Sequence, residues 1–234
     1  MAMGEPACWI CGAVADSAEH MVKASDVRAN LPGLTHRRPA FRHTKHQRNI
    51  PVRGAQAPIL KFKPSICQHC NNARSQPWDR AWETLERGVR EARPQLREGD
   101  RIPLGRIFPV NRQQAMLNVH LFLTKMFGCV AVENSIPVPI ESFARHLMNG
   151  TPDPSIRLVF VHIPPGSTKI KIQVGHVNVR NDNQTGHTAT AVWHYIVGTL
   201  GVAVSFAKPG LHQLRFTTNL GWHPDDVNRT WTLR

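Results

Sequence analysis

Long apolar runs are absent from this sequence. It contains no stretch of about 18 apolar residues, the length that a membrane-spanning helix needs. The most apolar segment, residues 116–127, is interrupted by Asn118, His120 and Lys125, and we interpret it as a buried helix. The N-terminus, MAMGEPACWIC, lacks the charged region and apolar stretch of a secretory signal. We therefore expect no membrane contact, a cytoplasmic location and reduced cysteines.

Acidic residues are the scarce charged class. The 234 residues include 29 Lys and Arg but only 16 Asp and Glu, which gives a formal net charge of +13. Between Asp26 and Asp79 the chain has ten basic residues and no acidic one. An excess of positive charge attracts polyanions, so nucleic acid is the first candidate partner. The alternative is a basic protein without such a partner.

Apolar periodicity predicts helices in three places. The predicted ranges are 77–93, 111–127 (ended by Gly128) and 139–149 (ended by Gly150). In the first range one apolar stripe recurs at helical spacing, at Trp78, Trp82, Leu85 and Val89. We expect these tryptophans to lie in the core rather than to stack on bases.

The residues after position 150 predict strands instead. Runs rich in β-branched and aromatic residues, separated by turn signals, cover 155–163, 169–180, 188–198, 201–207 and 212–218. Alternation of polar and apolar residues in KIKIQVGHV is typical of a half-buried antiparallel strand. The chain is therefore predicted to be α+β, with an N-terminal domain (1–95), a linker (96–108) and a C-terminal α+β domain (109–234) whose sheet is mostly antiparallel.

Cysteines are few, but four of the five form two C-x-x-C pairs, Cys8 with Cys11 and Cys67 with Cys70. In a reducing compartment two such pairs are the ligand set of a tetrahedral zinc site. Four thiolates close the metal shell and leave no position for water, so this zinc would be structural. The alternatives are coincidence or redox pairs, although a thioredoxin-like pair would need a βαβ context that is not evident. We interpret Cys129 as a core residue.

Three segments together resemble the zinc-stapled HNH (ββα-metal) nucleases: CWIC, then AEHMVKAS, then KPSICQHCNNARSQPWDRAW. The resemblance covers residues 6–88. It implies a ββα-metal fold for the N-terminal domain and hydrolysis of phosphodiester bonds, in DNA rather than RNA. It also implies His20 as the general base and Glu19 and Asn71 as ligands of a catalytic Mg²⁺ or Mn²⁺, with Asn72 as the fallback for Asn71.

Elementary chemistry agrees with these roles. Mg²⁺ prefers oxygen ligands, which Glu and Asn supply, and an ordinary histidine pKa near 6.5 suits proton abstraction at neutral pH. Arg74, one turn after Asn71, is placed to hold a phosphate oxygen. One geometric condition applies to Glu19 and His20. Neighbours in a regular strand point to opposite faces, so the two can act together only at a strand end or bend.

Two positions depart from the family pattern. Phe62 stands where the family has an asparagine that orients the histidine, and Lys23 stands where many members have proline. Asn49, a backbone carbonyl or another group must then orient His20. These departures keep a second hypothesis open, a catalytically inactive zinc-containing module that binds nucleic acid. A third is a zinc-stabilised protein-interaction domain.

The acid-free segment supplies the predicted nucleic-acid contacts. Its candidate phosphate-binding side chains are Arg37, Arg38, Arg42, Lys45, Arg48, Arg53, Lys61 and Lys63. The alternative is a solvated loop without a ligand. The C-terminal domain carries no signature of its own, and targeting or self-association as a homo-oligomer are the roles we expect for it.

Overall fold

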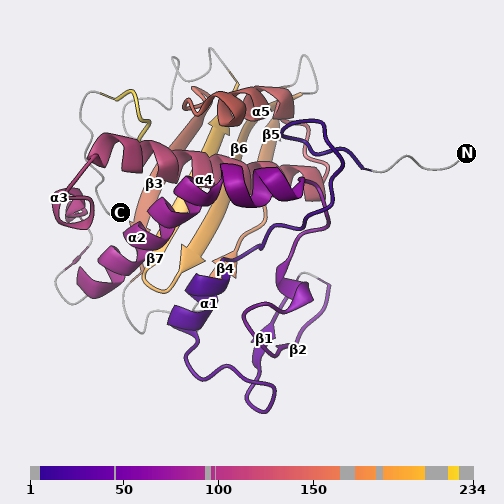
Figure 1. Ribbon diagram of the computed structural model, residues 1–234, viewed down its shortest axis with the longest axis vertical. Coiled ribbons are helices and arrows are strands. Elements are labelled where there is room, and N and C mark those ends of the chain that lie inside the picture. Colours follow the sequence, from indigo (N-terminus) through magenta and orange to yellow (C-terminus); the bar gives the residue numbers. More distant parts are fainter. Residues whose placement is uncertain are drawn as a thin grey trace, which may run out of the picture.

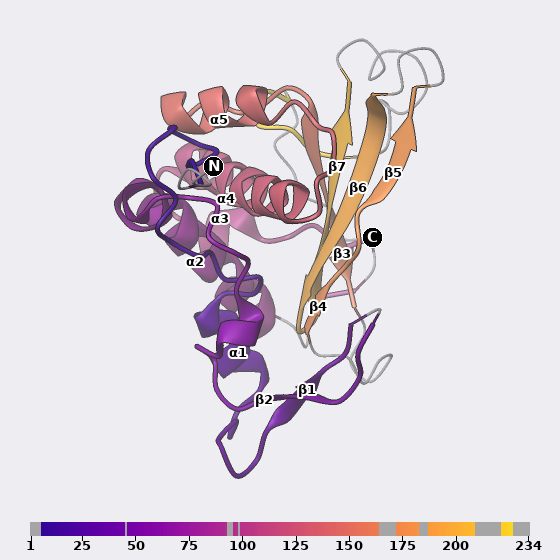
Figure 2. The same cartoon turned by 90° about the vertical axis from the view of Figure 1, so that its right-hand side faces the viewer.

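The computed structural model describes residues 6–44, 46–92, 96–97, 99–163, 172–182, 187–208 and 221–226. Helices and antiparallel strands are both present, so the predicted α+β class is confirmed. Helices form a layer on one face of the larger sheet, and a small two-stranded sheet lies at one end of the molecule (Figure 1, Figure 2).

The larger sheet is antiparallel throughout. Its strands are β3 (Ile156–His162), β4 (Ile172–Val174), β5 (Asn178–Asn181), β6 (Thr188–Val197) and β7 (Leu200–Ala207), in the order β3-β7-β6-β4, with β5 also paired to β6. Over most of its length strand β6 alternates buried and half-buried side chains. The predicted strands at 155–163, 188–198 and 201–207 are confirmed, whereas 212–218 lies outside the described residues.

The predicted strand at 169–180 is two strands, β4 and β5, separated at residues 175–177. The Gly175 N–H donates to the carbonyl of His194 at 2.8 Å. A Cβ atom at Gly175 would lie 3.2 Å from that oxygen, so the backbone of β6 leaves little room for a side chain there. The register against β6 then shifts by one residue, from Val174 opposite Tyr195 to Asn178 opposite Val192, so β4 and β5 are separate strands.

Three helices make up the covering layer: α2 (Gln76–Ala92), α4 (Arg112–Glu133) and α5 (Ile140–Asn149). The apolar stripe of α2 is buried, and the Trp82 ring stacks on Phe122 of α4 with centroids 5.2 Å apart. Gly150 ends α5 with φ of +64°, the left-handed conformation that glycine adopts readily. The predicted helices at 77–93 and 139–149, and the core position of Trp82, are confirmed.

The predicted end of α4 at Gly128 is wrong, because the helix continues to Glu133. A Cβ atom at position 128 would overlap the ring of Trp9, which packs against the helix at this point. Gly128 therefore makes room for an aromatic ring instead of ending the helix. Cys129, the next residue, is fully buried in the core, as predicted.

By length and composition α4 could also cross a membrane. However, 78% of its apolar window is buried inside the protein. The residues around it come from α2, α5 and the sheet, which places α4 at the centre of the core. The buried helix expected at 116–127 is thus confirmed.

The predicted linker contains a short helix, α3 (Leu104–Ile107). Ile102, Leu104 and Phe108 are buried in a hydrophobic core that also takes in residues from both predicted domains. The division into 1–95 and 109–234 stays a prediction, but the side chains on the two sides of it pack together.

The described residues between positions 6 and 75 form short elements, as expected from their lack of periodicity. They are α1 (Ala24–Asn30), β1 (Ala40–Arg42), β2 (Ile50–Val52), the 3-10 turn Pro58–Leu60 and the π-helical turn η2 (Cys70–Arg74). Isolated antiparallel bridges join Ser17 to Ile66 and His20 to Lys61. Two extended segments therefore lie side by side, and the second leads through η2 into α2.

Candidate functional site

The predicted cysteine cluster is present. The sulfur atoms of Cys8, Cys11, Cys67 and Cys70 all lie within 4.8 Å of one another. Such spacing fits four ligands of one tetrahedral ion, so the cluster could hold a structural metal such as zinc. Burial raises the pKa of the Cys70 thiol, which a bound cation would oppose by favouring the thiolate. Within the described part of the chain, no other group of three or more His, Cys, Asp or Glu side chains is arranged in this way.

Backbone hydrogen bonds shape this cluster. The Gly12 N–H donates to the Cys8 carbonyl at 2.8 Å, and Gly12 has φ of +79°, so the first pair forms a tight turn. The Trp9 N–H donates to the Ser65 carbonyl at 3.1 Å, which joins that turn to the segment before Cys67. The clamp thereby aligns residues 17–20 with residues 61–66.

His20 lies on this aligned segment and is half-buried. Its Nε2 atom is 2.8 Å from Oε1 of Gln56. An amide oxygen only accepts hydrogen bonds, so Nε2 must carry the proton and Nδ1 keeps a free lone pair. Gln56 thus supplies the orienting contact that the sequence left open, while Phe62 is buried in the core. No sequence signal pointed to Gln56.

The surroundings of His20 favour its neutral form. Burial is the largest cause that lowers its pKa below the ordinary value, and the nearby cations Lys61 and Lys23 act in the same direction. Glu19 acts in the opposite direction but does not outweigh them. His20 is therefore a proton acceptor at neutral pH.

Glu19 has a different environment. Its side chain is 8% exposed, and Oε1 accepts a hydrogen bond from the His20 backbone N–H at 2.7 Å. Its Oε2 atom forms an ion pair with the ammonium of Lys125, which comes from α4 and is fully buried. Both carboxylate oxygens of Glu19 are thus engaged within the chain.

Lys125 also contacts the start of α2. Its Nζ atom lies 3.3 Å from Oδ1 of Asp79 and 3.1 Å from the hydroxyl of Ser75. Burial lowers the pKa of Lys125, but the charges of Glu19 and Asp79 outweigh it and the net shift is upward. The ammonium is therefore a permanent buried cation surrounded by oxygen atoms.

The sequence analysis did not identify Asp79 and Lys125 as site residues. Lys125 had one visible signal, because it interrupts an otherwise apolar run and a buried charge needs a partner. The cluster extends outward through Lys23, which lies 3.2 Å from Asp79 and 3.5 Å from Glu83. The lysine in the position where the family has proline is thus part of an ion network.

Asn71 is one of the residues that line a groove between Lys23 and the start of α2. Its Nδ2 atom donates to the Ser17 hydroxyl at 2.8 Å, and its backbone N–H donates to the Cys67 carbonyl at 2.9 Å. The groove has a volume of about 600 Å³ and is lined by Lys23, Asn71, Asn72, Ala73, Gln76, Asp79, Arg80 and Glu83. His20 is not among these residues.

Arg74 is not among the residues that line this groove, and its guanidinium donates to the Met148 carbonyl in α5 at 3.4 Å. The predicted phosphate contact of Arg74 stays a prediction.

In the conformations that they adopt, the side chains of Glu19 and Asn71 do not form a ligand set for a divalent cation. One carboxylate oxygen of Glu19 accepts a hydrogen bond from the His20 backbone N–H, and the other forms an ion pair with Lys125. Only the amide oxygen of Asn71 is left to act as a ligand, and Mg²⁺ sites are ordinarily built on carboxylates. Ligation by this pair stays a prediction, and it requires Glu19 to leave Lys125.

The predicted nucleic-acid contacts mostly face solvent. The exposed members are Arg37, Arg38, Arg48, Arg53 and Lys63, and Lys61 is half-buried. Arg42 turns inward, donates to the Ile59 carbonyl, and has its pKa lowered by burial. Lys45 lies outside the described residues.

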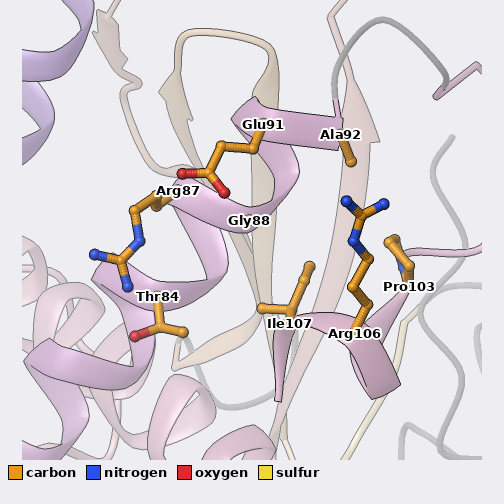
Figure 3. A pocket seen from close by; sticks show the side chains of 8 residues that line it. All are labelled: Thr84, Arg87, Gly88, Glu91, Ala92, Pro103, Arg106 and Ile107. Atoms are coloured by element: carbon orange, nitrogen blue, oxygen red, sulfur yellow. The ribbon is translucent and has the colours of Figure 1, made fainter. Parts of the chain in front are cut away.

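A second hollow lies away from this site, between α2 and α3. It has a volume of about 180 Å³ and is lined by Thr84, Arg87, Gly88, Glu91, Ala92, Pro103, Arg106 and Ile107. Figure 3 shows Arg87 and Arg106 on opposite sides, with Glu91 and Ile107 between them. Polar groups do not converge on one point here, so we assign this hollow no role.

Comparisons with known proteins leave the identity open: no protein-family profile, curated protein or solved structure matches the chain.

Proposed function

We propose that this protein binds nucleic acid and hydrolyses phosphodiester bonds in it as an endonuclease, with DNA as the preferred substrate. The observation that carries the proposal is the 2.8 Å contact between His20 Nε2 and Gln56 Oε1, on a segment aligned by the cysteine clamp. This contact fixes the imidazole in the form that accepts a proton at Nδ1.

His20 would act as the general base. Neutral at physiological pH, it takes a proton from the water that attacks phosphorus, a role that contributes about 10²–10⁴-fold to the rate of such reactions. A divalent cation, when bound, would neutralise charge on the phosphate. The chain's own contribution is to orient His20 through Gln56 and to attract the phosphate through the acid-free segment.

Zinc has a structural role in this proposal. Four thiolates would complete its shell, so it would bind no water for catalysis. It would hold residues 8–11 against residues 67–70, and without it the alignment of His20 with Lys61 would lose its anchor.

A second candidate is a module that binds nucleic acid without cutting it. The ion pair between Glu19 and Lys125 favours this alternative, because an ammonium already neutralises the carboxylate that the resemblance assigns to a divalent cation. The charge pattern that attracts nucleic acid is the same in both cases. Self-association through the C-terminal part stays a prediction.

Plasmid cleavage separates the two candidates. The zinc-loaded protein is incubated with plasmid DNA and Mg²⁺ or Mn²⁺, beside His20→Ala and the matched control His176→Ala, which replaces an exposed histidine in the segment between β4 and β5. We expect nicking by the parent and the control, and a loss of about 10²-fold or more in His20→Ala. Salt-sensitive binding by all three without cleavage would support the module. No salt-sensitive affinity would leave only a protein-interaction domain.

A further inference from the structure

Strands β1 and β2 form a ribbon two strands wide. They pair antiparallel with each other and with no other strand among the described residues. Both views place the ribbon at one end of the molecule, beyond α1 and away from the helix layer (Figure 1, Figure 2). None of the helices α2, α4 and α5 covers the ribbon in these views, and its contact with the body includes the 3-10 turn Pro58–Leu60.

The two faces of the ribbon differ. Residues directly opposite each other in an antiparallel pair share a face. Arg42 lies opposite Ile50 on the inner face, and its guanidinium reaches the Ile59 carbonyl of the body. Phe41 lies opposite Pro51 on the outer face, where the Phe41 side chain is 56% exposed. A large aromatic ring thus faces solvent on the projecting element.

Exposed arginines flank this ring in the sequence. Arg37 and Arg38 precede β1, while Arg48 and Arg53 flank β2, and all four are exposed. Among the described residues no carboxylate lies within ion-pair distance of any of them. Exposed arginines on and next to a ribbon that also carries an exposed aromatic ring match a polyanion that offers apolar surface.

We infer that this ribbon enters the major groove of duplex DNA, with Phe41 against the base edges and the flanking arginines on phosphates. The major groove of B-form DNA is about 12 Å wide and admits a two-stranded ribbon, and phenylalanine contacts the thymine methyl group there. The major groove of an RNA helix is too deep and narrow for this. A single aromatic ring on a narrow ribbon also differs from the multi-ring platforms that hold single strands.

The inference rests on the proposed function in one respect, namely that the partner is nucleic acid. It goes further by naming the ribbon and Phe41 as the reading element and B-form duplex DNA as the ligand. It does not depend on cleavage, since Phe41 and the flanking arginines are not among the residues that bond His20 or shift its pKa.

Fluorescence anisotropy tests the inference in the zinc-loaded His20→Ala background, which prevents cutting. The probes are a labelled duplex DNA, a duplex RNA of the same sequence and the single DNA strand. We expect duplex DNA to bind at least about tenfold more tightly than either other probe. Methyl green, a major-groove ligand, should displace the protein, and netropsin, a minor-groove ligand, should not.

Two substitutions assign the roles of the side chains. Phe41→Ala should weaken duplex DNA binding by about tenfold with an unchanged salt dependence, because apolar contact is lost. Val110→Ala, which trims a side chain that is 73% exposed outside the ribbon, is the matched control and should have no effect. Arg48→Ala should reduce the slope of log affinity against log salt by about 0.9, as expected for one lost phosphate contact. Arg87→Ala on α2 is its control.

The outcomes separate this inference from the proposed function. Equal affinity for DNA and RNA duplexes, displacement by netropsin, or an unchanged affinity of Phe41→Ala would overturn the ribbon inference while leaving nucleic acid as the partner. An absence of binding to all three probes would overturn both. Circular dichroism and zinc content test whether each variant is folded. We expect each variant to be folded, because the altered side chains are exposed.

Discussion

Replacing Lys125 with methionine should destabilise the protein by about 3–5 kcal/mol, the usual result of removing one partner of a buried ion pair. The Lys125 side chain is completely buried, and Glu19 is almost as inaccessible. Asp79 would keep a cation, because Lys23 lies 3.2 Å away. Glu19 would keep only the hydrogen bond from the His20 amide, so its negative charge would be uncompensated.

A double-mutant cycle measures this effect. Glu19→Gln alone should cost about 1–2 kcal/mol, because Lys125 still has Asp79 as a partner. The double variant should recover about 2 kcal/mol relative to the sum of the single changes, since it leaves no unpaired carboxylate at position 19. Urea unfolding followed by tryptophan fluorescence, at a fixed zinc concentration, gives the four free energies.

The prediction is wrong if the free energy of unfolding of Lys125→Met is within about 1 kcal/mol of the parent value. It is also wrong if Glu19→Gln restores no stability when it is added to Lys125→Met. Either result would mean that Glu19 does not carry a buried charge held by Lys125. Repeating the parent titration with Mg²⁺ or Mn²⁺ adds a second check. A ligand that binds only the folded state stabilises it, so stabilisation by these cations would show that they bind the native protein, as the endonuclease proposal requires.

Three further predictions concern metal and protons. Elemental analysis should find one zinc per chain, and Cys11→Ser should lower both the zinc content and the melting temperature; an unchanged melting temperature would contradict a structural role. Burial raises the pKa of Asp26 from 3.8 to about 7, so its contribution to stability is present at low pH and is lost as pH rises towards 7, up to about 4 kcal/mol. Asp26→Asn should therefore remove the decrease in the free energy of unfolding between pH 3.8 and pH 7, measured by urea unfolding. An NMR titration should give His20 a pKa below the ordinary histidine value of 6.5, and Lys61→Ala should raise that pKa because a nearby cation is removed. A pKa above 6.5 in the parent would contradict the burial of the ring.

Local rules explain what the sequence predicted correctly. Two C-x-x-C pairs carry their own geometry, so the cluster of Cys8, Cys11, Cys67 and Cys70 was predictable without knowledge of the fold. The stripe that includes Trp82 follows the helical period, and Gly150 ends a helix in the way glycine usually does. Each of these signals lies within a few residues of the structure that it predicts.

Long-range packing explains what the sequence could not supply. Gly128 looked like a helix end, yet its meaning depends on Trp9, far away in the chain. The well-patterned strand around Gly175 is interrupted because its register against β6 shifts by one residue, which depends on a distant part of the chain. The pairing of Glu19 with Lys125 likewise joins two distant segments, and neither period nor spacing links them.

The packing of Trp9 into the space at Gly128 also has a consequence for biosynthesis. The cysteine turn leaves the ribosome long before α4 does, so its tryptophan has no helix to cover it at that stage. A fragment that stopped before α4 would keep all four thiols but would expose this indole and leave Glu19 without its counter-ion. We therefore expect the contacts of Trp9 and Glu19 to form only after α4 has been made, and expression of either half alone should give a protein prone to aggregation.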